Sequence, residues 1–197
     1  MSWKNINTVT LNSERLCLRP IQADDKSQLG ELAKDPSIWT YFVQQILSDA
    51  DLEKFMLSAL ADTQAATRVV FTIQDRPSGE ILGSMAYGNL SELERRLEIG
   101  WSWLGKRHRG TGANREAKRL LLQHAFDVLG CERVEFKTDV LNAQARKGLR
   151  NIGATEEGVL RSYNYMPGGR RRDAIYYSIL KSEWPSVMVR MAEQARR

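Results

Sequence analysis

The sequence of 197 residues is poor in cysteine and in long apolar runs. Its two cysteines, Cys17 and Cys131, match no metal or redox spacing, so we expect buried thiols and no bound metal. No apolar run approaches the roughly 20 residues that span a bilayer. The N-terminus lacks an apolar signal core and a cleavage site, which argues against export. These absences predict a cytoplasmic protein without a membrane partner.

Charge and hydrophobicity are both moderate. Hydrophobic residues make up 42% of the chain, enough for a core, and the net charge of +5 suits anionic small molecules. Recognised nucleic-acid motifs are lacking, so we expect no direct nucleic-acid binding. Repeats and flexible linkers are also lacking. The prediction is a single domain over 1–197, with a core of about 14–181 and a helical tail over 182–197.

Strand and helix patterns alternate along the chain. Period-2 or β-rich patterns predict strands, and apolar residues at helical spacing predict helices. The class is therefore α/β or α+β with a mixed sheet. The expected strands are 14–20, 68–75, 80–88, 97–104, 133–140, 154–165 and 174–185, and the expected helices are 23–35, 48–62, 113–129, 142–153 and the tail.

The segment 97–104, "LEIGWSWL", alternates strictly between large apolar residues and small or polar ones. This pattern predicts a half-buried strand. We expect its two faces to carry Leu97, Ile99, Trp101 and Trp103 on one side, and Glu98, Gly100 and Ser102 on the other.

A glycine-rich basic loop leads into the most amphipathic segment. Gly110 and Gly112 follow Arg107, His108 and Arg109 and precede a predicted helix. Glycine allows positive φ and close backbone approach, and a helix N-terminus attracts anions. The loop is therefore a candidate phosphate site, or else a plain strand-to-helix turn. The helix should bury Ala117, Leu120, Leu121, Ala125, Val128 and Leu129 and carry Lys118, Arg119, Gln123 and Asp127 on its other face.

Two familiar phosphate loops do not match. Gly105 and Gly110 have the Walker A separation, but Thr111 and Gly112 replace its Lys and Ser or Thr. The dinucleotide fingerprint lacks its third glycine, because Arg115 stands there, and the preceding strand alternates instead of being uniformly apolar. A third pattern, [QR]-x-x-G-x-[GA], is matched in full.

The context of that third pattern is specific. "EIGWSWL" precedes the loop and "DVLNAQARKGLRNIGA" follows the next strand. Over Glu14 to Lys181 the chain resembles the GNAT superfamily of acetyl-CoA-dependent N-acyltransferases, and most of all the branch that acetylates N-termini of ribosomal proteins. The resemblance implies a mixed, mostly antiparallel central sheet flanked by helices.

The resemblance also implies where acetyl-CoA, the co-substrate, would bind. The pyrophosphate would lie on the loop backbone, and the pantetheine arm would pair with the strand before it, as in β-augmentation. The implied cofactor-binding residues are Trp101, Trp103, Leu104, Arg107, His108, Arg109, Gly110, Thr111, Gly112, Ala113, Asn114, Asn142 and Arg146.

Three positions depart from the family pattern. Ala145 replaces a serine, Leu149 a tyrosine that often protonates the leaving thiolate, and Ala154 a phenylalanine. The thiolate must then receive its proton elsewhere. The departures also keep open a second reading, a coenzyme A or acyl-CoA sensor without turnover.

Amine attack on a thioester, in a ternary complex, needs a proton acceptor and donors for the oxyanion. Glu98 and Ser102 lie four residues apart on the predicted strand face. We expect Glu98 to act as base and Ser102 as polar helper or thiolate acid. The alternative is that Glu98 is a solvated strand residue.

The acceptor is open to several readings. The resemblance favours a protein N-terminal amine, while a small amine, a polyamine or an antibiotic remains an alternative. Tyr163 and Tyr165 could line its pocket, as could Trp39, Tyr41 and Phe42, which otherwise belong to the core. "GGRRRD" (168–173) predicts a solvated hairpin tip or an anion-attracting one, and exposed strand edges make a homodimer plausible.

Overall fold

The structure, a computed structural model, describes residues 3–195. The strands are β1 (Leu11–Asn12), β2 (Leu16–Pro20), β3 (Val69–Asp75), β4 (Ile81–Ser91), β5 (Arg96–Leu104), β6 (Arg133–Asp139), β7 (Thr155–Tyr165) and β8 (Arg171–Leu180). The helices are η1 (Ala23–Asp25), α1 (Lys26–Ala33), η2 (Pro36–Tyr41), α2 (Asp49–Gln64), η3 (Lys106–His108), α3 (Ala113–Gln123), η4 (His124–Val128), α4 (Ala143–Asn151) and α5 (Trp184–Ala195).

Within residues 3–195 the strands form one sheet in the order β1-β2-β3-β4-β5-β6-β8-β7. All neighbours are antiparallel except β5 and β6. The parallel pair joins Arg96–Glu98 to Arg133–Glu135, and no further pair of residues connects β5 to β6 in the described chain. The two strands therefore part beyond Glu98. The predicted mixed, mostly antiparallel sheet with flanking helices is confirmed.

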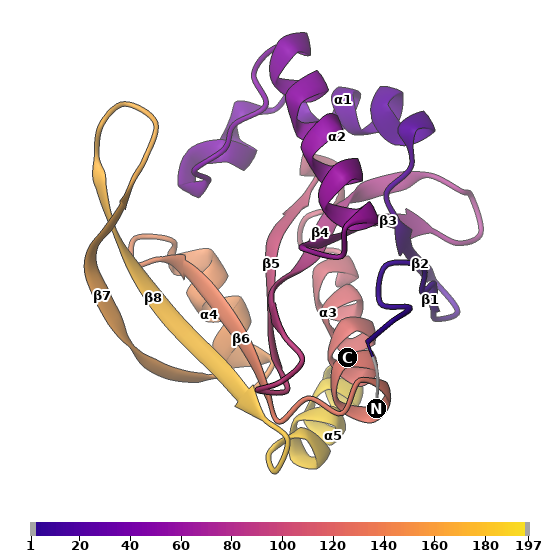
Figure 1. Ribbon diagram of the computed structural model, residues 1–197, viewed down its shortest axis with the longest axis vertical. Coiled ribbons are helices and arrows are strands. Elements are labelled where there is room, and N and C mark those ends of the chain that lie inside the picture. Colours follow the sequence, from indigo (N-terminus) through magenta and orange to yellow (C-terminus); the bar gives the residue numbers. More distant parts are fainter. Residues whose placement is uncertain (1–2, 196–197) are drawn as a thin grey trace.

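Each face of the sheet has its own apolar core. Alternate residues of β4 divide between the cores, since Tyr87 packs with α3 and α5 while Ala86 packs with α1 and α2. Figure 1 shows α1 and α2 on one side of the sheet, α3 and α5 on the other, and the β7–β8 hairpin curving away from both. The sheet thus separates two layers of helices.

The C-terminal helix docks on the body. Its Trp184 ring stacks on Phe126 at 5.4 Å between centroids, and Val187 and Met191 are buried in the same core. The helix begins at Trp184, slightly after the predicted boundary, and the last two residues of the predicted tail lie outside the described residues. Cys131 is buried as expected, whereas Cys17 is half-buried.

A β-bulge interrupts the alternation predicted for β5. Gly100 pairs with Ala86 and Trp103 with Ser84, so Trp101 and Ser102 together face Met85. Trp101 has φ of +51° and is 37% exposed. The prediction that it shares a buried face with Leu97 and Ile99 is wrong, because the extra residue reverses the pleat. Beyond the bulge, Trp103 lies on the side of Glu98.

A π-helical turn, η4, ends the helix that begins with α3. The Leu129 N–H donates to the His124 carbonyl at 3.0 Å, five residues back, and so the turn is wider than an α-turn. Val128, which α-helical spacing places in the core, is 60% exposed because of this change of pitch. No helix among residues 3–195 is both long and apolar enough to cross a bilayer.

Candidate functional site

A cavity of about 1140 Å³ opens where β5 and β6 part. Residues from both faces of the sheet line it, so it has two halves. The α3–α4 half is lined by Arg109, Gly110, Gly112, Asn114, Arg115, Lys118, Asn142, Ala145, Leu149 and neighbours. The Glu98 half is lined by Trp39, Tyr41, Phe42, Arg68, Glu98, Trp101, Lys137, Tyr163, Asn164, Arg172 and neighbours.

The α3–α4 half contains the glycine loop. Gly110 and Gly112 have φ of +77° and +86°, a region that side chains with a Cβ disfavour. Gly112 begins α3, and no described side chain caps the free N–H groups of its first turn. A Cβ built on Gly110 would meet nothing within 4 Å among the described atoms. Backbone conformation therefore requires glycine here, and the space before the helix end is open to an anion.

Lys118 belongs to this half, although its spacing predicts the outer face of the helix. It follows Asn114 by one helical turn, and its Nζ donates to the Asn114 side-chain oxygen. Loss of hydration lowers the pKa of Lys118 to about 8. Lys118 is half-buried on the face of α3 away from the core, as predicted, and the cavity extends along that face beyond the loop.

Most of the residues that the resemblance assigned to the cofactor line this cavity. They are Trp101, Trp103, Leu104, Arg109, Gly110, Gly112, Asn114 and Asn142. Arg109 ties the loop to its surroundings, since its Nε donates to the Leu104 carbonyl at 3.2 Å and its Nη1 to Ser37 Oγ at 3.0 Å. Asn142 caps α4, accepting from the Ala145 N–H at 3.0 Å. A contact of these residues with a cofactor stays a prediction.

The other assigned side chains are engaged elsewhere. Arg107 pairs with Glu80 and donates from Nε to His108 Nε2 at 3.1 Å, which draws both side chains toward the β3–β4 turn. Thr111 Oγ1 donates to the His108 carbonyl at 2.8 Å. Ala113 is buried in the core. Arg146 donates to the Val140 carbonyl at 2.9 Å. These five can contact a ligand at the loop through backbone groups or after rearrangement.

Glu98 lies where the two halves meet. It is 3% exposed, so the alternative of a solvated strand residue is wrong. Its Oε2 accepts from Asn89 Nδ2 at 2.7 Å and lies 3.4 Å from Lys137 Nζ. Burial raises the pKa of Glu98, against the opposing effects of Lys137 and Asn89. A carboxylate held in place, with a raised pKa, beside a cavity has the properties of a general base.

Ser102 also lines the cavity, but its relation to Glu98 is not the predicted one. The bulge at Trp101 and Ser102 breaks the shared strand face on which the pairing was based. Ser102 Oγ donates to the Gly100 carbonyl at 3.3 Å. The roles of Glu98 as base and Ser102 as helper stay predictions.

Aromatic side chains wall the Glu98 half. Trp39 is buried, and its ring centroid lies 5.3 Å from that of Trp103 and 5.4 Å from that of Phe42. Two roles were predicted for these residues, core packing and lining of the acceptor pocket. Trp39 and Phe42 pack in the core and also line the cavity. Tyr163 lines the cavity, whereas Tyr165 lies outside it, under the Arg171 guanidinium at 4.4 Å.

Within "GGRRRD", Gly168 to Arg171 are exposed, as predicted for a solvated hairpin tip, whereas Arg172 is buried. Arg170 pairs with the buried Asp139, and Arg171 bonds to Ser162 across the hairpin. Arg172 is 6% exposed and lines the Glu98 half. Sequence reasoning also missed Asn89, Arg68 and Lys137, which come from three different strands or turns. A period-2 reading of β6 places Lys137 on one face with Glu135, but no local pattern brings these groups to Glu98.

Comparisons with known proteins agree with this geometry. The family described as acetyltransferase (GNAT) domain matches residues 15–155. "Uncharacterized N-acetyltransferase p20" of Bacillus licheniformis is 29% identical over 176 residues, covering 89% of this chain and 98% of that protein. "Putative ribosomal N-acetyltransferase YdaF" of Bacillus subtilis is 29% identical over 191 residues, covering 87% and 94%.

A solved structure is also similar to this chain. A crystal structure from T. thermophilus, described as an acetyltransferase, is 31% identical and superposes with a TM-score of 0.85. The match covers 94% of this chain and 96% of that one. The glycine loop before α3, the parted strands and these matches over nearly the whole chain lead to one conclusion: the protein belongs to the GNAT family and is an N-acetyltransferase.

Proposed function

We propose that the enzyme transfers the acetyl group of acetyl-CoA to a primary amine, with a protein N-terminus as the acceptor. The observation that carries the proposal is the cavity itself, which joins a helix N-terminus on one face of the sheet to a buried carboxylate on the other. The donor would then occupy the α3–α4 half and the acceptor the Glu98 half.

The α3–α4 half fits an anionic, nucleotide-bearing thioester. Its first-turn N–H groups have no side-chain cap in the described chain, and Arg109, Arg115 and Lys118 add positive charge. The backbone of β5 beyond Glu98 lacks a β6 partner within residues 3–195, so a pantetheine arm could pair with it. Acetyl-CoA supplies the activated acetyl group when bound.

The chain's own residues would then manage protons and water. Glu98 accepts the proton of the incoming amine as its nitrogen bonds to the thioester carbon and the carbon–sulfur bond breaks. The departing thiolate takes up a proton. Ser102 is our first candidate for that acid, and Tyr163 is a second, because its hydrogen bond with Tyr176 and the Lys137 charge lower the pKa of Tyr163. Trp39 and Trp103, both buried, would provide an apolar wall beside these groups.

Two features support a protein N-terminus over a small amine, a polyamine or an antibiotic. The Bacillus subtilis relative bears a ribosomal N-acetyltransferase name. The Glu98 half is open and aromatic, which suits the end of an extended chain. The sensor alternative draws on Ala145 and Leu149, which present apolar groups to the cavity where hydroxyls were expected.

A thiol-release assay separates these readings. Acetyl-CoA is mixed with the enzyme and with a panel of peptides bearing free N-termini, polyamines and aminoglycosides. Release with peptides but not with the other amines supports the proposal. Tight coenzyme A binding with no release for any amine would instead identify a sensor.

We further propose that the enzyme works in the cytoplasm as a homodimer. β7 is the outer strand of the sheet, and nearly all of its eleven residues are exposed. An unpaired edge of this length favours pairing with a second copy. Light scattering coupled to gel filtration would measure the mass, and a monomer at working concentration would contradict the dimer.

A further inference from the structure

Arg172 is a charged side chain of the cavity that has no role in the proposed chemistry. It lies on β8 opposite Asn164 of β7, and it is 6% exposed. Its Nε is buried without a hydrogen-bond partner among the described residues. A desolvated guanidinium without a carboxylate is costly, and proteins rarely retain one unless something else pairs with it.

The neighbouring charges are already matched. Lys137 lies 3.4 Å from Glu98, and Arg68 Nη2 lies 2.8 Å from Asp62 Oδ2. On the same hairpin Arg170 pairs with Asp139, while Arg171 does not line the cavity and donates a hydrogen bond to Ser162. Arg172 therefore provides the positive charge of the Glu98 half that no described carboxylate balances.

A second buried polar atom without a hydrogen-bond partner belongs to Asn164, which pairs with Arg172 across the hairpin. Asn164 Oδ1 is buried and accepts no hydrogen bond within the described chain, and its residue faces Arg172 in the β7–β8 register. The two residues point to the same side of the sheet as Glu98, since Arg172, Ala174 and Tyr176 alternate with the core residues Ile175 and Tyr177. One corner of the cavity thus offers an unused cationic donor and an unused acceptor.

We propose that the acceptor amine carries an anionic group, a carboxylate or a phosphate, which Arg172 binds. The inference rests on the proposed function and names its substrate class: a free amine with negative charge close by, such as an N-terminus followed by an acidic residue. Asn164 Oδ1 would accept an N–H of the same molecule. A guanidinium binds both kinds of anion with paired, charge-assisted hydrogen bonds. Polyamines and aminoglycosides, which are cationic, are excluded by the same charge.

The test compares matched acceptors. Peptides that differ only in Glu, phosphoserine, Gln or Lys at the second position are assayed for acetylation, and their binding is measured by calorimetry with coenzyme A present. A small pair, 4-aminobutyrate and its amide, separates free acids from peptides. We expect the preferred anionic acceptors to have a kcat/KM about 10- to 100-fold higher than that of their neutral counterparts. This is the range of a hydrogen bond to a charged group.

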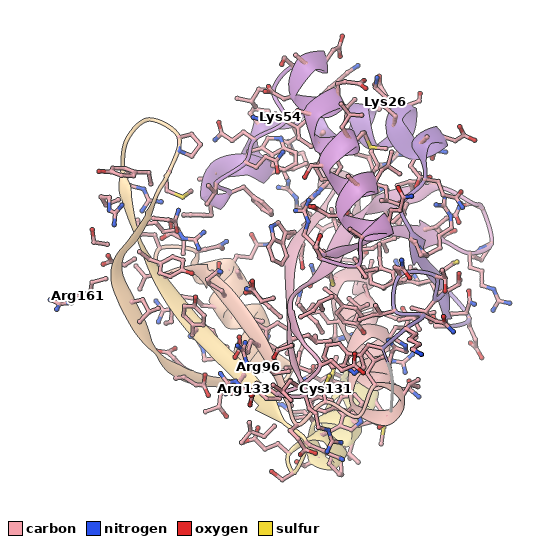
Figure 2. All side chains as sticks on the ribbon, in the orientation of Figure 1. Lys26, Lys54, Arg96, Cys131, Arg133 and Arg161 are labelled. Atoms are coloured by element: carbon pink, nitrogen blue, oxygen red, sulfur yellow. The ribbon has the colours of Figure 1, made fainter. Side chains whose placement is uncertain are left out.

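Arg172→Met should abolish that preference, while Arg172→Lys should keep part of it. Arg161→Met is the matched control, because Arg161 projects from the outer side of β7 (Figure 2). The KM for acetyl-CoA should not change in any variant. Thermal unfolding of Arg172→Met should be unchanged or raised, since a buried, unpaired charge is removed.

Several results would overturn the inference. Acetylation of neutral and acidic peptides at equal rates would leave the proposed function standing and refute the anionic acceptor. A preference that survives Arg172→Met would refute the role of Arg172, and so would loss of the fold in that variant, because it would mean a structural role. If no amine is acetylated, the proposed function fails, and calorimetry that also shows no preference for the Glu peptide would refute the inference separately.

Discussion

The two halves of the cavity are built in different ways. The proposed anion site of the α3–α4 half would draw on one short stretch, Gly110 to Lys118, where backbone conformation and a helix end supply the binding groups. The Glu98 half gathers side chains from η2, β5, β6, β7 and β8, together with Arg68 just before β3. A backbone site tolerates change in most side chains around it. A side-chain site can change its specificity one residue at a time.

The largest effect should come from Glu98, where the halves meet. Glu98→Gln should lower kcat by about 10²- to 10⁴-fold, as expected for loss of a general base. Because burial raises the pKa of Glu98, wild-type activity should rise as the pH increases through a value above that of an ordinary carboxyl, and this limb should vanish in the variant. The pH profile of kcat/KM checks both.

Stability provides a second readout for the same variant. A carboxyl whose pKa is raised by folding adds stability below its unfolded pKa and loses that contribution as the pH rises through the folded pKa. At neutral pH, Glu98→Gln should therefore be at least as stable as the wild type. Glu135→Gln is the control, since Glu135 pairs in register with Glu98 and is held by Arg133. Unchanged turnover and an unchanged pH profile in Glu98→Gln would refute its role as base.

The glycine loop should give the next largest effect, and it should be confined to the donor. Gly110→Val or Gly112→Val forces a β-branched residue to positive φ, at a cost of about 1–3 kcal/mol, and distorts the helix end. We expect coenzyme A binding to be lost in calorimetry while the circular dichroism spectrum is retained. Gly169→Val, at φ of +84° in the β7–β8 turn, matches the strain outside the loop. Unchanged binding in the loop variants would contradict the anion site.

Lys118 tests whether the α3–α4 half uses a side chain as well as the backbone. Its pKa of about 8 means that it carries its charge below that pH and loses it above. Coenzyme A affinity should therefore fall as the pH rises through about 8. Lys118→Gln should weaken binding about tenfold below that pH, the effect of one charged hydrogen bond, and flatten the profile. Lys147→Gln, on the exposed side of α4, is the control. A pH dependence that persists in Lys118→Gln would show that another group titrates.

The smallest effect should come from Gly88, which tests how tightly the Glu98 half is shaped. A Cβ at Gly88 would lie 2.3 Å from Trp101 Cζ3, so Gly88→Ala must displace that ring. We expect the acceptor KM to rise about 3- to 10-fold, with the donor KM unchanged, because an overpacked side chain shifts its neighbours and Trp101 lines the Glu98 half. Tryptophan fluorescence would report the displacement. A donor KM that rises equally would mean that the halves are not separable.

Local patterns predicted the parts of the molecule that are built locally. The α3 helix, its glycine loop, the Asn142 cap and the β3–β4 hairpin each depend on neighbours within a few residues, and each forms as predicted. The family resemblance added the order in which they assemble. The sequence could also single out Glu98, because a carboxylate on a half-apolar strand is unusual.

The errors occurred where tertiary structure overrides a regular period. The bulge moved Trp101 away from the core face, and the π-turn moved Val128 to the surface. Lys118 lines the cavity together with residues of α4, and Arg172 is buried on the β7–β8 hairpin that lines the other half. Contacts between distant segments create these environments, and no short-range pattern records them.

The brief pairing of β5 with β6 has one more consequence. Since three residue pairs join these strands before they part, one cavity is lined from both faces of the sheet. If donor and acceptor bind in opposite halves as proposed, each can bind, and its product can leave, from its own side of the sheet. Neither reactant then has to bind before the other. Reciprocal plots of rate against the concentration of either reactant should intersect instead of running parallel.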